Sequence, residues 1–156
     1  MKHLNSIYDL LFEALETYNW EFINDDDKHV RYKFEDSFGN KFLVEFKNTG
    51  FRDLSTEYEV SYFVWDEDKR SYSVSKMVKS NPYNTIHTIL GEGGIIYDFI
   101  KRKSWAKRIV MHGLSKEVEK DYVSQRTKIY IRFLERNPIP GFKLKYSMNT
   151  INLIKL

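Results

Sequence analysis

The sequence predicts a single α+β domain over residues 1–156, in which three helices cover a mixed, mainly antiparallel sheet. The predicted order of elements is α-β-β-β-(β)-α-β-α-β-β. Two observations support this fold class. Apolar and polar residues alternate between residues 30 and 64, which is typical of strands that bury one face. In the second half, apolar residues recur at helical spacing and supply helices to cover that face.

The composition limits the class of protein. The chain has 156 residues, of which 42% are hydrophobic and 30% are charged, so we expect a folded, soluble domain. Cysteine is absent, which excludes disulfides, thiolate metal sites and cysteine nucleophiles. No apolar run approaches the length that spans a membrane, and the N-terminal residues lack a signal-peptide pattern. We therefore expect a cytoplasmic protein.

Charge is unevenly distributed between the two halves. Residues 1–78 hold 10 Lys or Arg and 16 Asp or Glu, whereas residues 79–156 hold 15 and 6. The basic half is suited to phosphate-bearing partners. The same asymmetry also fits two halves of one sheet that attract each other, or a homo-oligomer.

The first half predicts one helix and then a meander of strands. Ser6 and Asp9 form a capping pattern ahead of an apolar helical repeat that ends near Tyr18. Alternation predicts strands over residues 30–35, 42–47 and 57–64, with Gly39-Asn40 as the loop of the first hairpin. Residues 72–78 form a candidate fourth strand. An acidic stretch at residues 25–27 is interpreted as a solvated loop.

The second half predicts two helices, a short strand and a closing hairpin. Asn81-Pro82 starts a helix that continues to about Lys103. Residues 109–111 form a short buried strand. A helix begins at Ser115 and ends before Pro138, and residues 142–146 and 150–156 pair as a hairpin.

The glycines at 91, 93 and 94 are candidate cofactor-binding residues. A glycine-rich turn that opens a helix presents backbone amides to a phosphate. That interpretation requires residues 85–90 to be a strand. In the alternative interpretation the glycines lie inside a helix, where each costs about 1 kcal/mol relative to alanine. The sequence leaves both interpretations open for Gly91, Gly93 and Gly94.

Candidate acids and bases are few. Glu57 and Glu59 lie on a long predicted strand, where an acidic groove would receive a basic amine, although an ordinary exposed sheet face explains them equally well. His112 follows the short strand at a position where open sheets tend to place ligands, and His87 lies beside the glycines. Either histidine is a candidate general base, or a packing or surface residue. No metal-binding motif occurs.

Two surface features suggest partners. Phe63 and Trp65 would be exposed on their strand if the Tyr58 face is the core, and exposed aromatics suit a protein interface. Trp105 lies among basic residues, an arrangement found in nucleic-acid sites and also at ordinary helix C-termini.

The last third of the chain carries a resemblance to a known family. The stretch from Arg126 to Leu134, read with Gly141-Phe142, is similar to the last segment of the GNAT N-acetyltransferases, as is the order of elements. The resemblance implies a GNAT-like fold. It also implies that Tyr130 is the acid that protonates the departing coenzyme A thiolate.

The chain also resembles small uncharacterised proteins from bacteriophages and bacteria. The similarity covers residues 58–146 in patches, with a core at residues 88–89, 95–100 and 126–130. It implies no activity. If the chain is phage-encoded, the expected location is the host cytoplasm.

The departures from the acetyltransferase pattern determine the favoured function. No glycine lies between Ser75 and Asn84, where the family needs its pyrophosphate turn, and Ser124 and Gln125 replace the customary asparagine. We therefore expect a protein that acts by binding, through Phe63 and Trp65, to a protein partner and without a cofactor.

The alternative function is an acyl-coenzyme A-dependent N-acyltransferase. In that case the three glycines would hold acetyl-coenzyme A, Tyr130 would be the acid, and Glu57 or Glu59 the base. A second alternative is a nucleic-acid-binding module.

Overall fold

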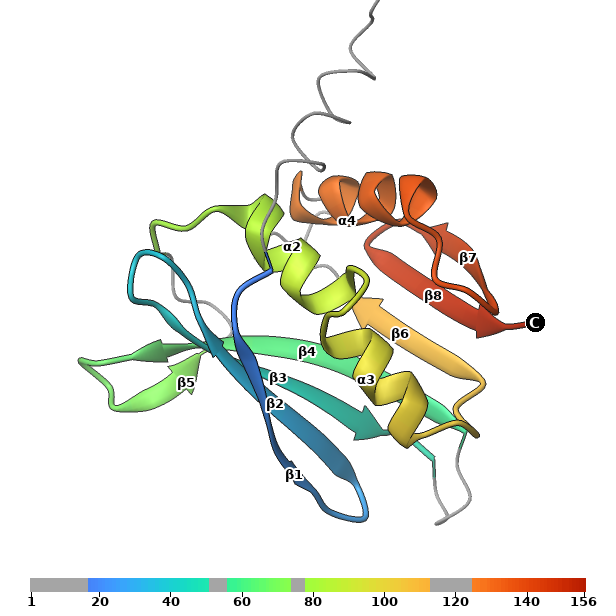
Figure 1. The fold of residues 1–156 in the computed structure, drawn as a ribbon, viewed down its shortest axis with the longest axis horizontal. Coiled ribbons are helices and arrows are strands. Elements are labelled where there is room, and N and C mark those ends of the chain that lie inside the picture. Colours follow the sequence, from blue (N-terminus) through green and yellow to red (C-terminus); the bar gives the residue numbers. More distant parts are fainter. Residues whose placement is uncertain (1–16, 51–55, 74–77, 113–124) are drawn as a thin grey trace, which may run out of the picture.

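The computed structural model describes residues 17–50, 56–73, 78–112 and 125–156 of the chain (Figure 1). Most of the predicted first helix lies outside the described residues. So do most of the predicted strand 72–78 and the start of the predicted helix at Ser115.

The described chain forms one large mixed sheet of eight strands. The order is β1-β2-β3-β4-β6-β8-β7, with β5 paired to β4. Every pair is antiparallel except β4 with β6, which is parallel. The strands are β1 Trp20–Asp25, β2 His29–Glu35, β3 Lys41–Asn48, β4 Glu57–Asp66, β5 Ser71–Ser73, β6 Arg108–His112, β7 Phe142–Ser147 and β8 Thr150–Lys155.

Three short helices are described, namely α2 Pro82–Leu90, α3 Ile95–Arg102 and α4 Gln125–Arg136. The predicted start at Asn81-Pro82 is confirmed. The Asn81 side chain caps α2 by accepting hydrogen bonds from the amides of Tyr83 (3.0 Å) and Asn84 (3.4 Å). Residues 83–90 are therefore helix and not strand.

The prediction of a GNAT-like fold, with three helices covering a mainly antiparallel sheet, is wrong. The chain is mostly a large eight-stranded mixed sheet, and its described helices have only nine, eight and twelve residues. β1 was not predicted, and it pairs with β2 as a hairpin. The coarser expectation of an α+β protein is confirmed.

The predicted helix from Asn81 to Lys103 breaks into α2 and α3 at the glycines. A Cβ on Gly94 would lie 2.4 Å from the Thr88 carbonyl oxygen and 2.7 Å from that of Gly91. Gly93 has a φ of +77°, in the left-handed region that favours glycine. These residues let the chain turn tightly and start a second helix that packs against the first.

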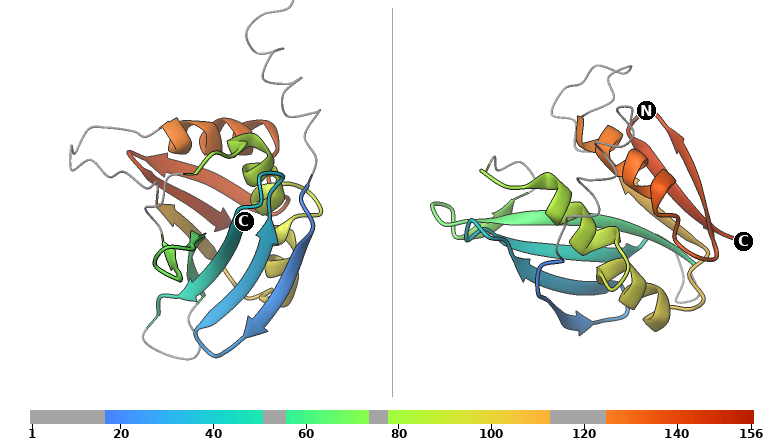
Figure 2. Two further views of the ribbon diagram at one scale, coloured as in Figure 1. Left: turned by 90° about the vertical axis from the view of Figure 1, so that its left-hand side faces the viewer. Right: turned by 45° about the horizontal axis from the view of Figure 1, so that its top comes forward.

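The core lies between the sheet and the helices, which cover the same sheet face (Figure 2). Tyr58 faces the core, since it is 4% exposed. Phe99 of α3 stacks on Phe46 of β3, with ring centroids 4.0 Å apart, and meets the Tyr58 ring edge-on. No described element covers the opposite face of the sheet.

A buried phenol fixes α3 to β2. Tyr32 is fully buried, and its hydroxyl donates a hydrogen bond to Asp98 Oδ2 at 2.7 Å. Asp98 also accepts a hydrogen bond from Arg102 Nε at 2.6 Å, and the Arg102 guanidinium lies over the Phe22 ring. Burial and the hydrogen bond to Asp98 raise the pKa of Tyr32, so the phenol stays neutral and acts as a structural donor.

Candidate functional site: a cavity between β4 and β6

The parallel strands β4 and β6 pair over a short length and then separate. Their paired positions run from Glu57 with Arg108 to Val60 with Met111. Beyond Val60, β4 continues and pairs with β5, whereas β6 ends at His112, which pairs with Thr150 of β8. In Figure 1, β4 runs on toward β5 while β6 stops beside α2. The sheet therefore opens where the pairing ends.

A cavity of about 140 Å³ occupies this opening, and we call it the β4–β6 cavity. Its lining comes from β3, β4, α2, β6 and α4, and comprises Val44, Glu59, Val60, Ser61, Tyr62, Ile89, Leu90, Met111, His112 and Tyr130. The strand alternation places Val60 and Met111 on the core face and Glu59 on the other face. Residues from both faces of the sheet thus contribute to the lining.

The cavity lining has an apolar part and a polar part. Val44, Leu90 and the other buried aliphatic side chains form the apolar part. Glu59 and His112 form the polar part, with Glu59 Oε1 4.0 Å from His112 Nε2. His112 Nδ1 lies 3.2 Å from the Thr150 hydroxyl, which orients the ring. Among the described lining residues there is no lysine or arginine, so Glu59 is the described lining group that attracts a cation.

The structure brings together two of the three predicted catalytic residues. Tyr130 comes from α4, is 8% exposed, and lines the same cavity as Glu59. Glu57 points to the same face as Glu59 but lies outside the cavity, where Arg108 Nη1 is 3.6 Å from its carboxylate. A carboxylate and a phenol on one cavity can accept and donate a proton, respectively.

The predicted cofactor-binding glycines lie between α2 and α3 and are not part of the cavity lining. The amide of Gly91 donates to the His87 carbonyl, and that of Gly94 donates to the Gly91 carbonyl. The Gly93 carbonyl accepts a hydrogen bond from the Trp20 indole. Two of these amides already donate hydrogen bonds within the protein, and the negatively charged Glu92 lies in the same turn. This segment therefore has few groups that could bind a pyrophosphate.

The two predicted partner-binding residues lie on the sheet face that no described element covers. Phe63 pairs across the strands with Leu43, and Trp65 with Tyr72. The Trp65 and Tyr72 rings meet edge-on, with centroids 5.1 Å apart. Both Phe63 and Trp65 are half-buried, because their strand neighbours shield part of each ring.

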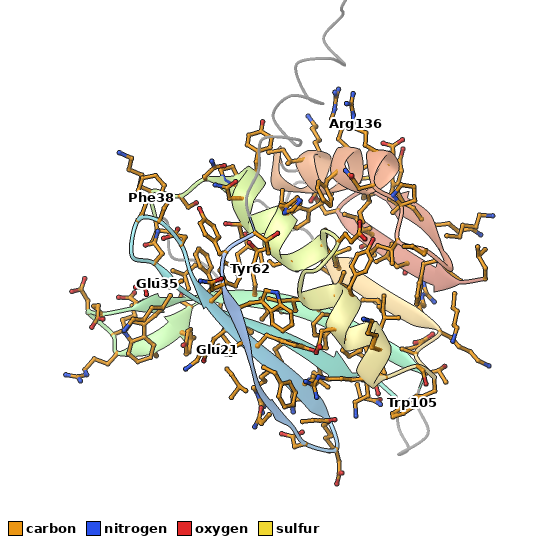
Figure 3. All side chains as sticks on the ribbon, viewed as in Figure 1. Glu21, Glu35, Phe38, Tyr62, Trp105 and Arg136 are labelled. Carbon is orange, nitrogen blue, oxygen red and sulfur yellow. The ribbon has the colours of Figure 1, made fainter. Side chains whose placement is uncertain are left out.

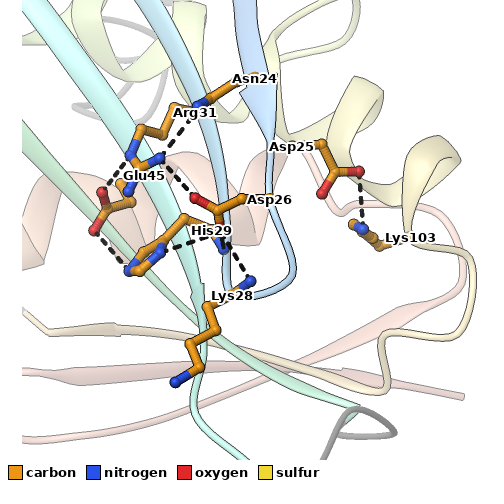
Figure 4. Close-up of polar contacts among 8 residues, drawn as sticks. All are labelled: Asn24, Asp25, Asp26, Lys28, His29, Arg31, Glu45 and Lys103. Atoms are coloured by element: carbon orange, nitrogen blue, oxygen red, sulfur yellow. Dashed lines mark hydrogen bonds and ion pairs between the residues drawn. The ribbon is translucent and has the colours of Figure 1, made fainter.

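A polar cluster near the β1–β2 turn is held together by its own charges (Figure 4). Arg31 bridges Glu45 Oε2 (2.9 Å) and Asp26 Oδ2 (3.0 Å), and the His29 ring lies between the same two carboxylates. The amides of Lys28 and His29 donate to Asp26 Oδ1, which lowers the pKa of this carboxyl to about 2, and Arg31 adds to the effect. The charged groups of this cluster pair with one another, so we interpret the cluster as a structural feature and not as a binding site.

Several basic residues near Trp105 also form ion pairs or hydrogen bonds within the protein. Trp105 is half-exposed at the end of the molecule where α3 turns into β6 (Figure 3). Lys103 Nζ lies 5.1 Å from its ring and 2.9 Å from Asp25 Oδ2. Arg102 is bound to Asp98, and Lys155 Nζ donates to the Ser104 carbonyl. Binding of nucleic acid by this region stays a prediction.

Comparisons with protein-family models, with curated proteins and with solved structures found no match. In the part of the chain that the structure describes, no group of three or more His, Asp or Glu residues is arranged to hold a metal ion. No helix among the described residues is long and apolar enough to cross a membrane.

Sequence reasoning missed most of the cavity lining. Ser61, Tyr62 and Met111 belong to strands that were predicted, but no local pattern marks them as lining residues. Three lining residues were singled out from the sequence, namely Glu59, Tyr130 and His112, the last from its position after the short central strand.

Proposed function

We propose that this domain binds a small amine in the β4–β6 cavity. The apolar body of the ligand would fill the part formed by Val60, Leu90 and Met111, and its protonated nitrogen would lie against Glu59. One observation carries the proposal: in the part of the chain that the structure describes, the lining combines a buried apolar wall with a carboxylate and has no lysine or arginine.

The volume limits the size of the group that enters. An apolar cavity of about 150 Å³ in another protein accommodates a molecule of the size of benzene. At about 140 Å³, the β4–β6 cavity accommodates one aromatic ring or a short branched chain. The ligand is thus a small amine, or the amine-bearing end of a longer molecule.

Glu59, Tyr130 and Ser61 supply the polar contacts. A carboxylate hydrogen-bonded to an ammonium group makes a charge-assisted bond, which is stronger than a neutral one. Tyr130 and Ser61 line the cavity with hydroxyl groups that can orient the ligand. Transfer of an acyl group to the bound amine would need an acyl donor as co-reactant, and the binding proposal does not depend on it.

Three probes of matched size test the proposal, namely benzylamine, benzyl alcohol and benzoate. Isothermal titration calorimetry should give the order of affinity benzylamine, then benzyl alcohol, then benzoate. Glu59→Gln should weaken benzylamine about three- to tenfold and leave benzyl alcohol unchanged, because Glu59 is partly exposed to solvent. Absence of binding by all three probes, or tighter binding of benzoate, would contradict the proposal.

A protein partner on the open sheet face is a second candidate function. The observation that favours it is the row of Leu43, Phe63, Trp65 and Tyr72, which lies on the face without a described covering element. Aromatic side chains of this kind dominate the energetics of protein interfaces.

The second candidate is tested by the double variant Phe63→Ser/Trp65→Ser. A partner purified with the wild-type protein should be lost by the double variant. It should be retained by Phe38→Ser, which removes an exposed aromatic of the β2–β3 loop (Figure 3). Equal retention by all three proteins would exclude this face as the interface.

A further inference from the structure

His112 lies where it can compete with a ligand for Glu59. It lines the β4–β6 cavity, and its Nε2 is 4.0 Å from Glu59 Oε1. The Thr150 hydroxyl is 3.2 Å from the other ring nitrogen, so the ring is held with Nε2 toward the carboxylate. An imidazolium at this position would occupy the side of Glu59 that an ammonium group needs.

We propose that protonated His112 competes with the bound amine for Glu59, so that the cavity releases its ligand on acidification. This inference rests on the proposed function. When His112 is neutral, Glu59 is free to bind the ammonium group. When His112 is charged, it neutralises Glu59 and repels the ligand, and affinity therefore falls as the pH falls.

Other charged and titratable groups face this pair from the neighbouring strands and helices. Lys47 on β3 lies opposite Glu59 in the strand register. Glu57 and Arg108 pair with each other on the same face, and Lys145 on β7 lies beyond Asn152. Tyr62 and Tyr130 face the cavity from the core side. Histidine is the side chain that ordinarily changes charge between pH 5 and 8.

The expected size of the pH effect on ligand affinity follows from the solvent exposure of the two side chains. The side chains of His112 and Glu59 are 54% and 38% exposed, so solvent screens their interaction. Exposed ion pairs contribute less than about 1 kcal/mol, which corresponds to a change of about two- to fivefold in affinity.

The experiment measures benzylamine affinity by calorimetry between pH 5.5 and 8, where the probe stays protonated. Wild-type protein should bind about two- to fivefold more tightly at pH 8 than at pH 5.5, and His112→Gln should bind equally at both. The matched control is His29→Gln, since His29 also lies beside carboxylates on this sheet face but outside the cavity. It should keep the wild-type pH dependence.

The NMR signals of the His112 side chain provide a second readout of the competition. Because binding and protonation are reciprocally coupled, benzylamine should lower the pH at which His112 titrates in an NMR experiment, and benzyl alcohol should not. If benzylamine affinity is independent of pH, or if His112→Gln keeps the wild-type dependence of affinity on pH, the proposed competition is wrong and the proposed function stands. Absence of benzylamine binding at every pH overturns both.

Discussion

Val60 and Met111 form the last paired position of the parallel strands β4 and β6. The cavity residues from these strands, 59–62 and 111–112, are centred on this pair. Because β4 continues toward β5 while β6 ends, hydrogen bonding between the strands stops within the sheet. The resulting gap places a carboxylate and an imidazole from one sheet face beside an apolar wall from the other.

Filling the β4–β6 cavity should abolish ligand binding. Val60→Phe adds an aromatic ring at the pair that opens the gap, and we expect benzylamine affinity to fall at least tenfold. Overpacking should also lower the free energy of unfolding by about 1–3 kcal/mol. Val64→Phe is the matched control, since Val64 is buried on the same face of β4 but outside the cavity. Unchanged calorimetric affinity in Val60→Phe would place the ligand elsewhere.

The turn between α2 and α3 should not tolerate a side chain at Gly94. The Cβ of Gly94→Ala would lie 2.4 Å from the Thr88 carbonyl oxygen, which belongs to the backbone and cannot rotate away. We expect the free energy of unfolding to fall by about 2–3 kcal/mol in urea denaturation. Glu92→Ala, at an exposed position of the same turn, should change it by less than about 0.5 kcal/mol. Equal effects in the two variants would show that the helices can separate at little cost.

The Asp26 carboxylate should make stability depend on pH in the acidic range. Its pKa is about 2 in the folded protein, against 3.8 ordinarily, so the unfolded chain binds its proton first as the pH falls. The stabilisation is complete above pH 4 and is lost as the pH falls toward 2. Asp26→Asn should therefore be less stable than wild type at pH 5, and the difference should shrink at pH 3 and below.

The measurement is chemical denaturation of wild type and Asp26→Asn at pH 5, 4 and 3. A constant difference between Asp26→Asn and wild type at all three values would show that the carboxylate charge is not the cause.

Phe99 should be among the most important residues for stability. Its ring is fully buried, stacked on Phe46 and edge-on to Tyr58, so Phe99→Ala leaves a cavity in the core. We expect a loss of about 3–5 kcal/mol in the free energy of unfolding. Trp105→Ala removes a larger but half-exposed ring and should cost about 0.5 kcal/mol. Similar losses in the two variants would contradict the packing of α3 on the sheet.

Alternation predicted the central strands well because their buried face is continuous. The runs from Val30 to Lys47 and from Glu57 to Val64, the strand at 109–111 and the closing hairpin all follow from it. β1 was missed, because its register shifts between Phe22 and Asn24 and its outer residues are exposed. That irregularity removes the period-two pattern on which sequence analysis depends.

The helix break and the cavity depend on contacts that no local pattern encodes. Gly94, the residue before α3, must be a glycine because another part of the backbone lies too close for a Cβ. Glu59, His112 and Tyr130 were each singled out from the sequence, but their meeting depends on where the pairing of β4 and β6 stops. A register between strands so distant in the chain is set by tertiary packing.

The most direct test of the β4–β6 cavity uses methyl NMR of ¹³C-methionine-labelled protein. Met111 lines the cavity, whereas Met148 is exposed on the turn between β7 and β8. Titration with benzylamine should shift the Met111 methyl signal in a saturable manner and leave that of Met148 unchanged. A Met111 signal that does not respond, or equal shifts at both methionines, would contradict binding in the cavity.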